Sequence, residues 1–161
     1  MMYRQRKAFS LLTAIFLILL MGSVASFVMS ISGKIVQETT SMYQKEQAVL
    51  LAKSYTELAI MTVMSNDRNS SSKCISDITG VIGAAGSSTN GEGYNVETRI
   101  AFIGLTTDIS SCAGVRQLGN PSVSDDLNII VDVYVRYKDI NSPIPASSPW
   151  VTYHRRTLQK I

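Results

Sequence analysis

The chain is poor in the residues that most enzymes use for catalysis, with one histidine and two cysteines among 161 residues. A Ser-His-Asp or Cys-His arrangement would have to use His154, which lies inside a predicted strand. The glycines are not followed by the Lys-Ser/Thr pair of a phosphate-binding loop. One histidine and two widely spaced cysteines do not supply a zinc ligand set. We therefore predict no catalytic residue, no cofactor and no metal site, and expect a protein that is not an enzyme.

Excess charge of either sign is also missing once the first seven residues are set aside. The formal net charge of +3 comes from 15 basic and 12 acidic residues, and Arg4, Arg6 and Lys7 account for the difference. The remaining chain is neutral and lacks the basic footprint typical of nucleic-acid binding. The run His154-Arg155-Arg156 is the nearest candidate for a basic patch. Adjacent strand residues face opposite ways, so we interpret it as solvated strand residues.

A long apolar run follows these three basic residues. No acidic or basic residue occurs from Ala8 to Gly33. As a helix, the segment from Phe9 to Ile31 would be about 35 Å long, enough to cross a bilayer core. The basic cluster should remain on the cytoplasmic side, which places everything after Lys34 on the other side of the membrane.

The junction between the basic and apolar residues resembles the cleavage region of type IV prepilins and type II secretion pseudopilins. The resemblance rests on residues 6–12, which read Arg-Lys-Ala-Phe-Ser-Leu-Leu. It implies cleavage by a prepilin peptidase between Ala8 and Phe9, methylation of the new N-terminus, and retention of the apolar helix as an anchor and later as a filament core. Ser10, Leu11, Leu12 and Gly22 fit the same pattern, since many pilins carry a glycine in this helix.

The resemblance also implies partners and a location. The partners are other pilin or pseudopilin subunits, the prepilin peptidase, an inner-membrane assembly platform and membrane lipid. The location is the bacterial inner membrane, single-pass, with the N-terminus cytoplasmic and the head periplasmic. Which machine is served, whether secretion, a pilus or DNA uptake, is not indicated.

One position departs from the family pattern. Members usually carry a glutamate four residues after the aromatic of the cleavage site, where this chain has Thr13. That carboxylate is thought to neutralise the N-terminal ammonium of a neighbouring subunit, since a lone charge in an apolar core costs several kcal/mol. No acidic residue lies between Phe9 and Glu38. We interpret Thr13 as a mark of a minor subunit at or near the filament tip. The alternative is a tolerated small polar residue that bonds the carbonyl of Phe9.

A second processing signal lies further along the apolar run. Ser23-Val24-Ala25 before Ser26 has the small residues that signal peptidase prefers. Its use would release a periplasmic binding domain with an ordinary signal peptide, and an uncleaved signal anchor is a further alternative. Apolar residues continue through Ile31, which favours the first interpretation.

Two cysteines, Cys74 and Cys112, lie in the part expected to be exported. An even number in an oxidising compartment favours a disulfide. Closing a loop of about 39 residues would stabilise the fold by roughly 4 kcal/mol. Two buried thiols are the alternative.

The remaining pattern predicts an α+β fold in which a long N-terminal helix packs on a small antiparallel sheet, as in pilins. We expect a leader at 1–8, a membrane helix at 9–32 and a head at 33–161 that includes the second half of the helix. The helix should run from Phe9 to about Asn66, followed by a short helix near Ile75 to Ile82 and a surface loop from Gly83 to Gly93. Strands are predicted at Tyr94–Leu105, Asn128–Lys138 and Trp150–Leu158. The residues expected to form the buried face of the long helix recur every seven positions: Ile35, Met42, Val49, Thr56 and Val63, with Ala52 and Ala59 between them.

Overall fold

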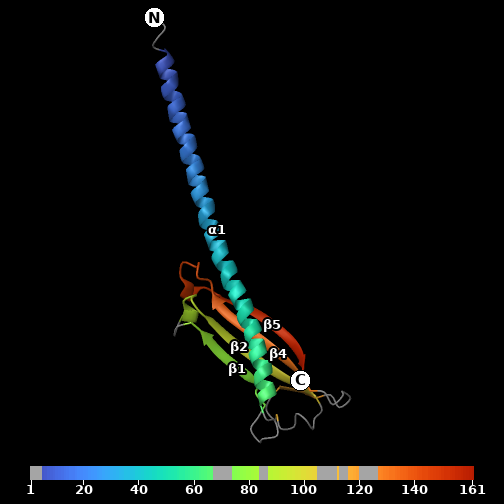
Figure 1. The fold of residues 1–161 in the computed structure, drawn as a ribbon. Coiled ribbons are helices and arrows are strands. Elements are labelled where there is room, and N and C mark those ends of the chain that lie inside the picture. Colours follow the sequence, from blue (N-terminus) through green and yellow to red (C-terminus); the bar gives the residue numbers. More distant parts are fainter. Residues whose placement is uncertain (1–4, 67–73, 84–86, 105–111, 113–115, 120–126) are drawn as a thin grey trace. The chain divides into compact units, whose positions relative to one another are not determined.

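The computed structural model describes residues 5–66, 74–83, 87–104, 112, 116–119 and 127–161 (Figure 1). The chain divides into two compact units, Met1–Thr40 and Ser41–Ile161. The first unit contains the N-terminal part of the long helix. The second unit, called the head below, contains the rest of that helix and the sheet.

The one α-helix among the described residues, α1, runs from Gln5 to Ser65. Its sequence contains no proline, and only Gly22 and Gly33 interrupt residues of ordinary helix propensity. It ends at a stretch of short polar side chains beginning with Asn66, which compete with the helical backbone for hydrogen bonds. The predicted helix is thus confirmed, with a start four residues earlier than expected.

The head contains one mixed sheet with the strand order β1-β2-β4-β5. Each of these four strands is antiparallel to its neighbours, and β3 pairs in parallel with the end of β2. The predicted α+β class is therefore confirmed. Short 3₁₀ turns cover Ser87–Thr89 and Pro145–Ser147. The strand bounds are β1 Asp77–Ile82, β2 Tyr94–Gly104, β3 Arg116–Gly119, β4 Asn128–Lys138 and β5 Trp150–Lys160.

The three predicted strands are found almost at their predicted bounds, but the helix predicted near Ile75 to Ile82 is wrong. This segment is strand β1, and each of its six residues has a partner in β2. Ile78, Thr79, Val81 and Ile82 are β-branched, which favours a strand once a neighbouring strand is present. Pairing with β2 therefore decides the structure of a segment with weak local preference.

The core lies between the inner face of the sheet and one side of α1. Burial alternates strictly along β2, and β4 has one buried face formed by Ile129, Val131, Val133, Val135 and Tyr137. Opposite these strands, α1 presents small side chains that allow the helix backbone to approach the sheet closely. The buried residues of α1 are Gln44, Ala48, Ala52, Thr56, Ala59 and Val63.

The predicted seven-residue pattern is only half right. Thr56 and Val63 are buried, as are Ala52 and Ala59, and Val49 is half-buried, whereas Ile35 and Met42 are exposed. A straight helix has 3.6 residues per turn, so a seven-residue repeat drifts by about 20° per repeat relative to a fixed face. Toward the N-terminus of the head, the buried face therefore passes to Ala48 and Gln44.

Gln44 links α1 to the connections at one end of the sheet. Its Nε2 donates to the carbonyl oxygens of Gly91 (2.8 Å) and Lys138 (3.4 Å), and its Oε1 accepts from the backbone N–H of Ile140 (3.5 Å). The buried hydroxyl of Tyr94 donates to the Gln44 carbonyl (3.2 Å). Burial, followed by the nearby Tyr137, raises the pKa of Tyr94 to about 12. Tyr94 therefore stays protonated as a donor across the physiological range.

The Tyr55 side chain of α1 lies directly against Gly80 of β1. A Cβ built at Gly80 would lie 2.0 Å from the Tyr55 hydroxyl oxygen and 2.9 Å from the adjacent ring carbon. Any larger residue at position 80 must displace the Tyr55 ring. This steric requirement explains a glycine in a strand, where glycine is otherwise unfavourable.

We predict that Gly80→Ala lowers the free energy of unfolding of the detergent-solubilised chain by about 1–3 kcal/mol, because it overpacks the contact with Tyr55. Urea unfolding followed by the fluorescence of Trp150, the only tryptophan, measures the change. Gly33→Ala is the control, because an added Cβ there meets nothing within 4 Å. In a Tyr55→Leu background the cost of Gly80→Ala should shrink. Equal stability of Gly80→Ala and the parent chain would contradict the steric account.

Candidate functional site

The residues predicted for processing and assembly lie in the first turns of α1. Ala8, Phe9 and Ser10 belong to the helix, and their side chains lie outside the described residues. Leu11 and Leu12 are exposed, as is Thr13. The structure therefore brings the described members of this group together on one exposed stretch of helix, and their roles stay predictions.

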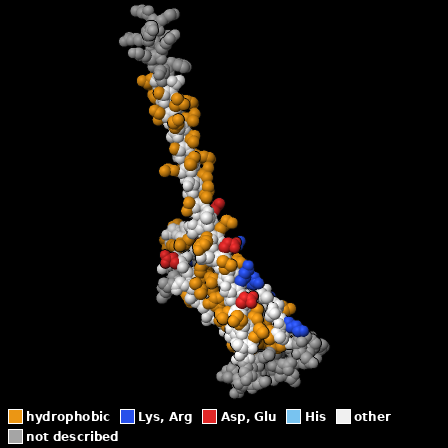
Figure 2. All heavy atoms as spheres, viewed as in Figure 1, with side chains coloured by type: hydrophobic (Ala, Val, Ile, Leu, Met, Phe, Trp, Pro, Cys, Tyr) orange, Lys and Arg blue, Asp and Glu red, His pale blue; other side chains and the backbone are white. Residues whose placement is uncertain are grey.

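The apolar surface of α1 is the most extensive candidate site in the described chain. Every residue from 11 to 39 is exposed, and Figure 2 shows hydrophobic side chains along this part of the helix. α1 is the one described helix long and apolar enough to cross a membrane, with a mean hydropathy of 2.5 over its most apolar window. A helix that is apolar all round needs lipid or protein around it. Its large exposed residues up to Ile31 are Leu11, Leu12, Ile15, Phe16, Leu17, Ile18, Leu19, Leu20, Met21, Val24, Phe27, Val28, Met29 and Ile31.

One polar side chain within this apolar segment, that of Ser23, finds its partner on the helix itself. Ser23 Oγ donates to the carbonyl oxygen of Leu20 (2.8 Å), which leaves no hydroxyl donor directed outward at that position. Such local bonds make a hydroxyl tolerable in hydrocarbon. Gly22 has no neighbour from the chain, since an added Cβ would meet nothing within 4 Å. The segment is thus suited to an apolar environment supplied from outside the chain.

Cys74 and Cys112 form the predicted disulfide. Cys74 lies three residues before β1, and Cys112 lies in the connection between β2 and β3. Both side chains are buried, and the bond closes a sequence separation of 38 residues. The bridge ties the segment leading into the edge strand β1 to a long connection of the head.

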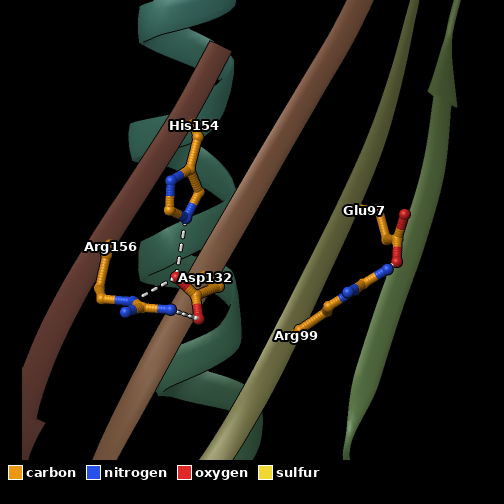
Figure 3. A network of polar contacts seen from close by, with 5 residues as sticks. All are labelled: Glu97, Arg99, Asp132, His154 and Arg156. Carbon is orange, nitrogen blue, oxygen red and sulfur yellow. Dashed lines mark hydrogen bonds and ion pairs between the residues drawn. The ribbon is translucent and has the colours of Figure 1, made fainter. Parts of the chain in front are cut away.

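A polar cluster lies on the outer face of the sheet, opposite α1 (Figure 3). Arg156 donates from Nε and from a terminal nitrogen to the two carboxylate oxygens of Asp132, at 2.7 and 2.9 Å. His154 Nε2 lies 2.8 Å from the same carboxylate, and its ring stacks on Tyr134 with centroids 4.5 Å apart. Hydrogen bonds from Arg156 lower the pKa of Asp132; burial opposes this shift and His154 adds to it.

A second group of charges continues across the neighbouring strands. Glu97 accepts from Arg99 on its own strand and from Arg136 on β4 at 2.9 Å. The Arg99 guanidinium lies 5.3 Å from the centre of the Tyr134 ring, which joins the two groups. An open hollow of about 470 Å³ borders Glu97 and Arg136 between β1 and β2. Each described cation here has an anionic or aromatic neighbour, an arrangement that stabilises a solvated sheet face.

The structure also decides the geometry of the sequence run His154-Arg155-Arg156. His154 and Arg156 lie on the outer face, whereas Arg155 points to the inner face and its buried Nε has no hydrogen-bond partner in the described part of the chain. The interpretation that these residues face opposite ways is confirmed. His154 contacts Asp132 and Tyr134, and no serine or cysteine side chain is among its described polar contacts.

The Asp132 cluster was not predicted from the sequence. Alternation in β4 and β5 indicated which side chains share a face, but the register between two strands is not contained in either pattern. The observed register places Asp132 opposite Arg156. The only signal in the sequence is an isolated acidic residue in one strand and consecutive basic residues in another.

Comparison with protein-family models, curated proteins and solved structures finds no match for this chain. The structure supplies a coarser likeness: a long helix, apolar in its N-terminal part, whose later part packs on an antiparallel sheet. This layout is compatible with a pilin-like fold.

We predict that replacing both Cys74 and Cys112 with serine lowers the free energy of unfolding by about 4 kcal/mol, because the unfolded chain regains the entropy of a loop of roughly 39 residues. Urea unfolding of the full chain, in parallel with reduced parent protein, measures the loss. The reduced parent should match the double variant. An unchanged midpoint on reduction would contradict a stabilising role of the bridge.

We predict that Asp132→Asn lowers stability at pH 7 by about 0.5–1 kcal/mol, the range of partly exposed ion pairs. Because the pKa of Asp132 is lowered by folding, its contribution is present above the usual pKa of about 3.9 and disappears as the pH falls through the lower folded value. The variant and the parent should therefore converge in acid. Urea midpoints between pH 2 and 7 measure the gap, with Glu57→Gln as an exposed control. A gap independent of pH would contradict the assignment.

Proposed function

We propose that this chain is a minor pilin or pseudopilin, a non-catalytic structural subunit of a type IV pilus or of a type II secretion filament. One observation carries the proposal. The same helix is apolar and exposed all round from residue 11 to the low thirties, and in its second half buries one face against the sheet of the head. An anchor that continues without interruption into the core of a folded head suits a subunit that keeps its membrane segment.

The apolar part of α1 would serve in two environments. In the inner membrane its side chains contact lipid, and in a filament they contact the helices of neighbouring subunits. Moving the helix from lipid to a filament core gives little hydrophobic free energy, because lipid tails are as apolar as leucine side chains. Close packing between the helices must therefore hold them together in the filament. Work from an assembly platform and its ATPase would drive extraction from the membrane.

Thr13 supports a position at or near the tip. The described helix carries no acidic side chain before Glu38, so this subunit cannot neutralise a neighbour's N-terminal ammonium with a carboxylate in the apolar segment. A subunit at the distal end has no neighbour beyond it that would require such a partner. This subunit would therefore begin an assembly more readily than extend one.

We predict that co-expression with a prepilin peptidase removes residues 1–8, so that the mature chain begins with Phe9. Intact mass and N-terminal sequencing of membrane-extracted protein measure the cleavage. The control is the same protein expressed without the peptidase, which should retain the leader. Both samples should remain in the membrane fraction, because the apolar helix is kept.

Two other outcomes would contradict the proposal. A mature chain that begins at Ser26 and is released without detergent would indicate an ordinary signal peptide and a periplasmic binding domain. A chain that keeps its leader in the presence of active peptidase would indicate a signal anchor.

A further inference from the structure

The sheet of the head ends in β5 on one side and in β1 on the other, where the four-residue strand β3 continues the edge beyond β1 along β2. Among the described residues, no strand pairs with the outer side of β1 or of β5. The outer-face residues of both strands are exposed, and among them Val81 of β1 is 61 % exposed. An open strand edge presents unpaired backbone donors and acceptors to any strand that can approach it.

The hydrogen-bond pattern identifies which backbone groups point outward. Ile100 N donates to Ser76 O (2.7 Å), so Ser76 and Ile100 form a hydrogen-bonded pair. Hydrogen-bonded and non-hydrogen-bonded pairs alternate along an antiparallel ladder, so the backbone N–H and C=O groups of Thr79 and Val81 in β1 point away from β2. Ile161 N donates to Leu127 O (2.9 Å), so Thr152 and His154 of β5 face away from β4. On both edges, the residues whose backbone N–H and C=O groups point away from the sheet are those whose side chains lie on its outer face.

The directions of the two edge strands are also compatible. Each step in the order β1-β2-β4-β5 is antiparallel, so β1 and β5 run in opposite directions. A second copy moved sideways by four strand spacings, about 19 Å, would place its β1 antiparallel to β5 of the first. A covering helix is about 10–12 Å wide, so the two copies of α1 would not collide on the inner face.

Charge selects β1 as the partner of β5. β5 carries Arg155, Arg156 and Lys160 without an acidic residue, and β1 carries Asp77 without a basic one. Across the sheet, Asp77, Arg99, Asp132 and Arg156 occupy one row, with alternating sign. Another copy's Asp77 beside Arg156 continues that alternation, whereas pairing β5 with a second β5 would place like charges together.

We propose that copies of this chain associate head to tail by adding β1 of one copy to the open edge of β5 of the next. In the register that continues these rows, Thr79 of one copy lies opposite His154 of the next copy, and Val81 lies opposite Thr152. The backbone N–H and C=O groups of all four residues point away from their own sheet. On the inner face Ile82, 38 % exposed, meets Val151, 40 % exposed, and the two cover each other. This association concerns the heads and holds whether or not the copies enter a filament.

Disulfide trapping in membranes tests the proposal. Val81→Cys and Thr152→Cys are introduced into separately tagged full-length chains, which are co-expressed and oxidised. Both positions are exposed, and the native cysteines are already bonded to each other. A disulfide requires Cα atoms within about 7 Å, so the mixed product should exceed either same-site product by about tenfold. Same-site products from Thr152→Cys, or a product with another protein, would overturn the proposal.

Charge reversal supplies a second measurement. Asp77→Lys in the Val81→Cys chain should reduce the mixed product by about threefold, the size of a surface charge effect. Glu92→Lys is the matched control, because it makes the same change at an exposed residue outside both edges. Equal yields for the two lysine variants would overturn the charge argument and with it the choice of β1.

A helix reporter separates this proposal from the proposed function. Ser30→Cys lies in the exposed apolar segment and forms dimers if the membrane helices of two copies pack together. Helix dimers without the Val81–Thr152 product would overturn the edge pairing and leave the filament proposal standing. The edge product without helix dimers would support the pairing, and the filament proposal would then be decided by the peptidase experiment alone.

Discussion

The close contact between α1 and the inner face of the sheet is the constraint on which the head depends. Ala48, Ala52, Thr56 and Ala59 give the helix a narrow buried face, and the sheet fills the space with Ile100, Phe102 and the valines of β4. Because the helix contributes little side-chain volume, its backbone must lie close to the strands. On β1, the Tyr55 ring lies so close to Gly80 that any larger residue there must displace the ring. The disulfide adds stability to a small head, since much of the chain's hydrophobic sequence lies in the exposed N-terminal segment.

The burial of the α1 side chains changes near the boundary between the two units. Up to residue 39 every described side chain from Leu11 is exposed, and from Gln44 onward one face is buried. Gln44 is a polar residue in a buried position, and its amide satisfies backbone groups at Gly91, Lys138 and Ile140. An apolar residue there would leave those backbone groups without this partner. The beginning of the head along α1 is thus defined by a hydrogen-bonding requirement as well as by packing.

Much of the fold could be predicted from local pattern, and the remainder depends on pairing. The alternation of Ile129, Val131 and Val133 identified β4 with correct bounds, because one face of that strand is buried. β1 was missed because a six-residue segment containing a glycine has little preference of its own until β2 pairs with it. β3 has four residues and pairs in parallel with a strand that precedes it by more than ten residues. The Asp132 cluster depends on register, which no single strand encodes. The disulfide was accessible to sequence reasoning, since only two cysteines exist.

The exposed apolar segment of α1 and the open sheet edges have related energetic consequences. A pairing of six residues per strand buries too little surface to hold two soluble proteins together, since stable interfaces bury about 1,200–2,000 Å². Insertion of the apolar segment into one membrane would remove part of the translational and rotational cost and would raise the effective concentration of one edge near another. Under that condition a weak, directional edge contact can order neighbouring heads, while Arg155 on the inner face of β5 and the absence of acidic residues on that strand disfavour non-specific pairing. An edge that is harmless in dilute solution would thus become selective only where the apolar helix has already brought copies together.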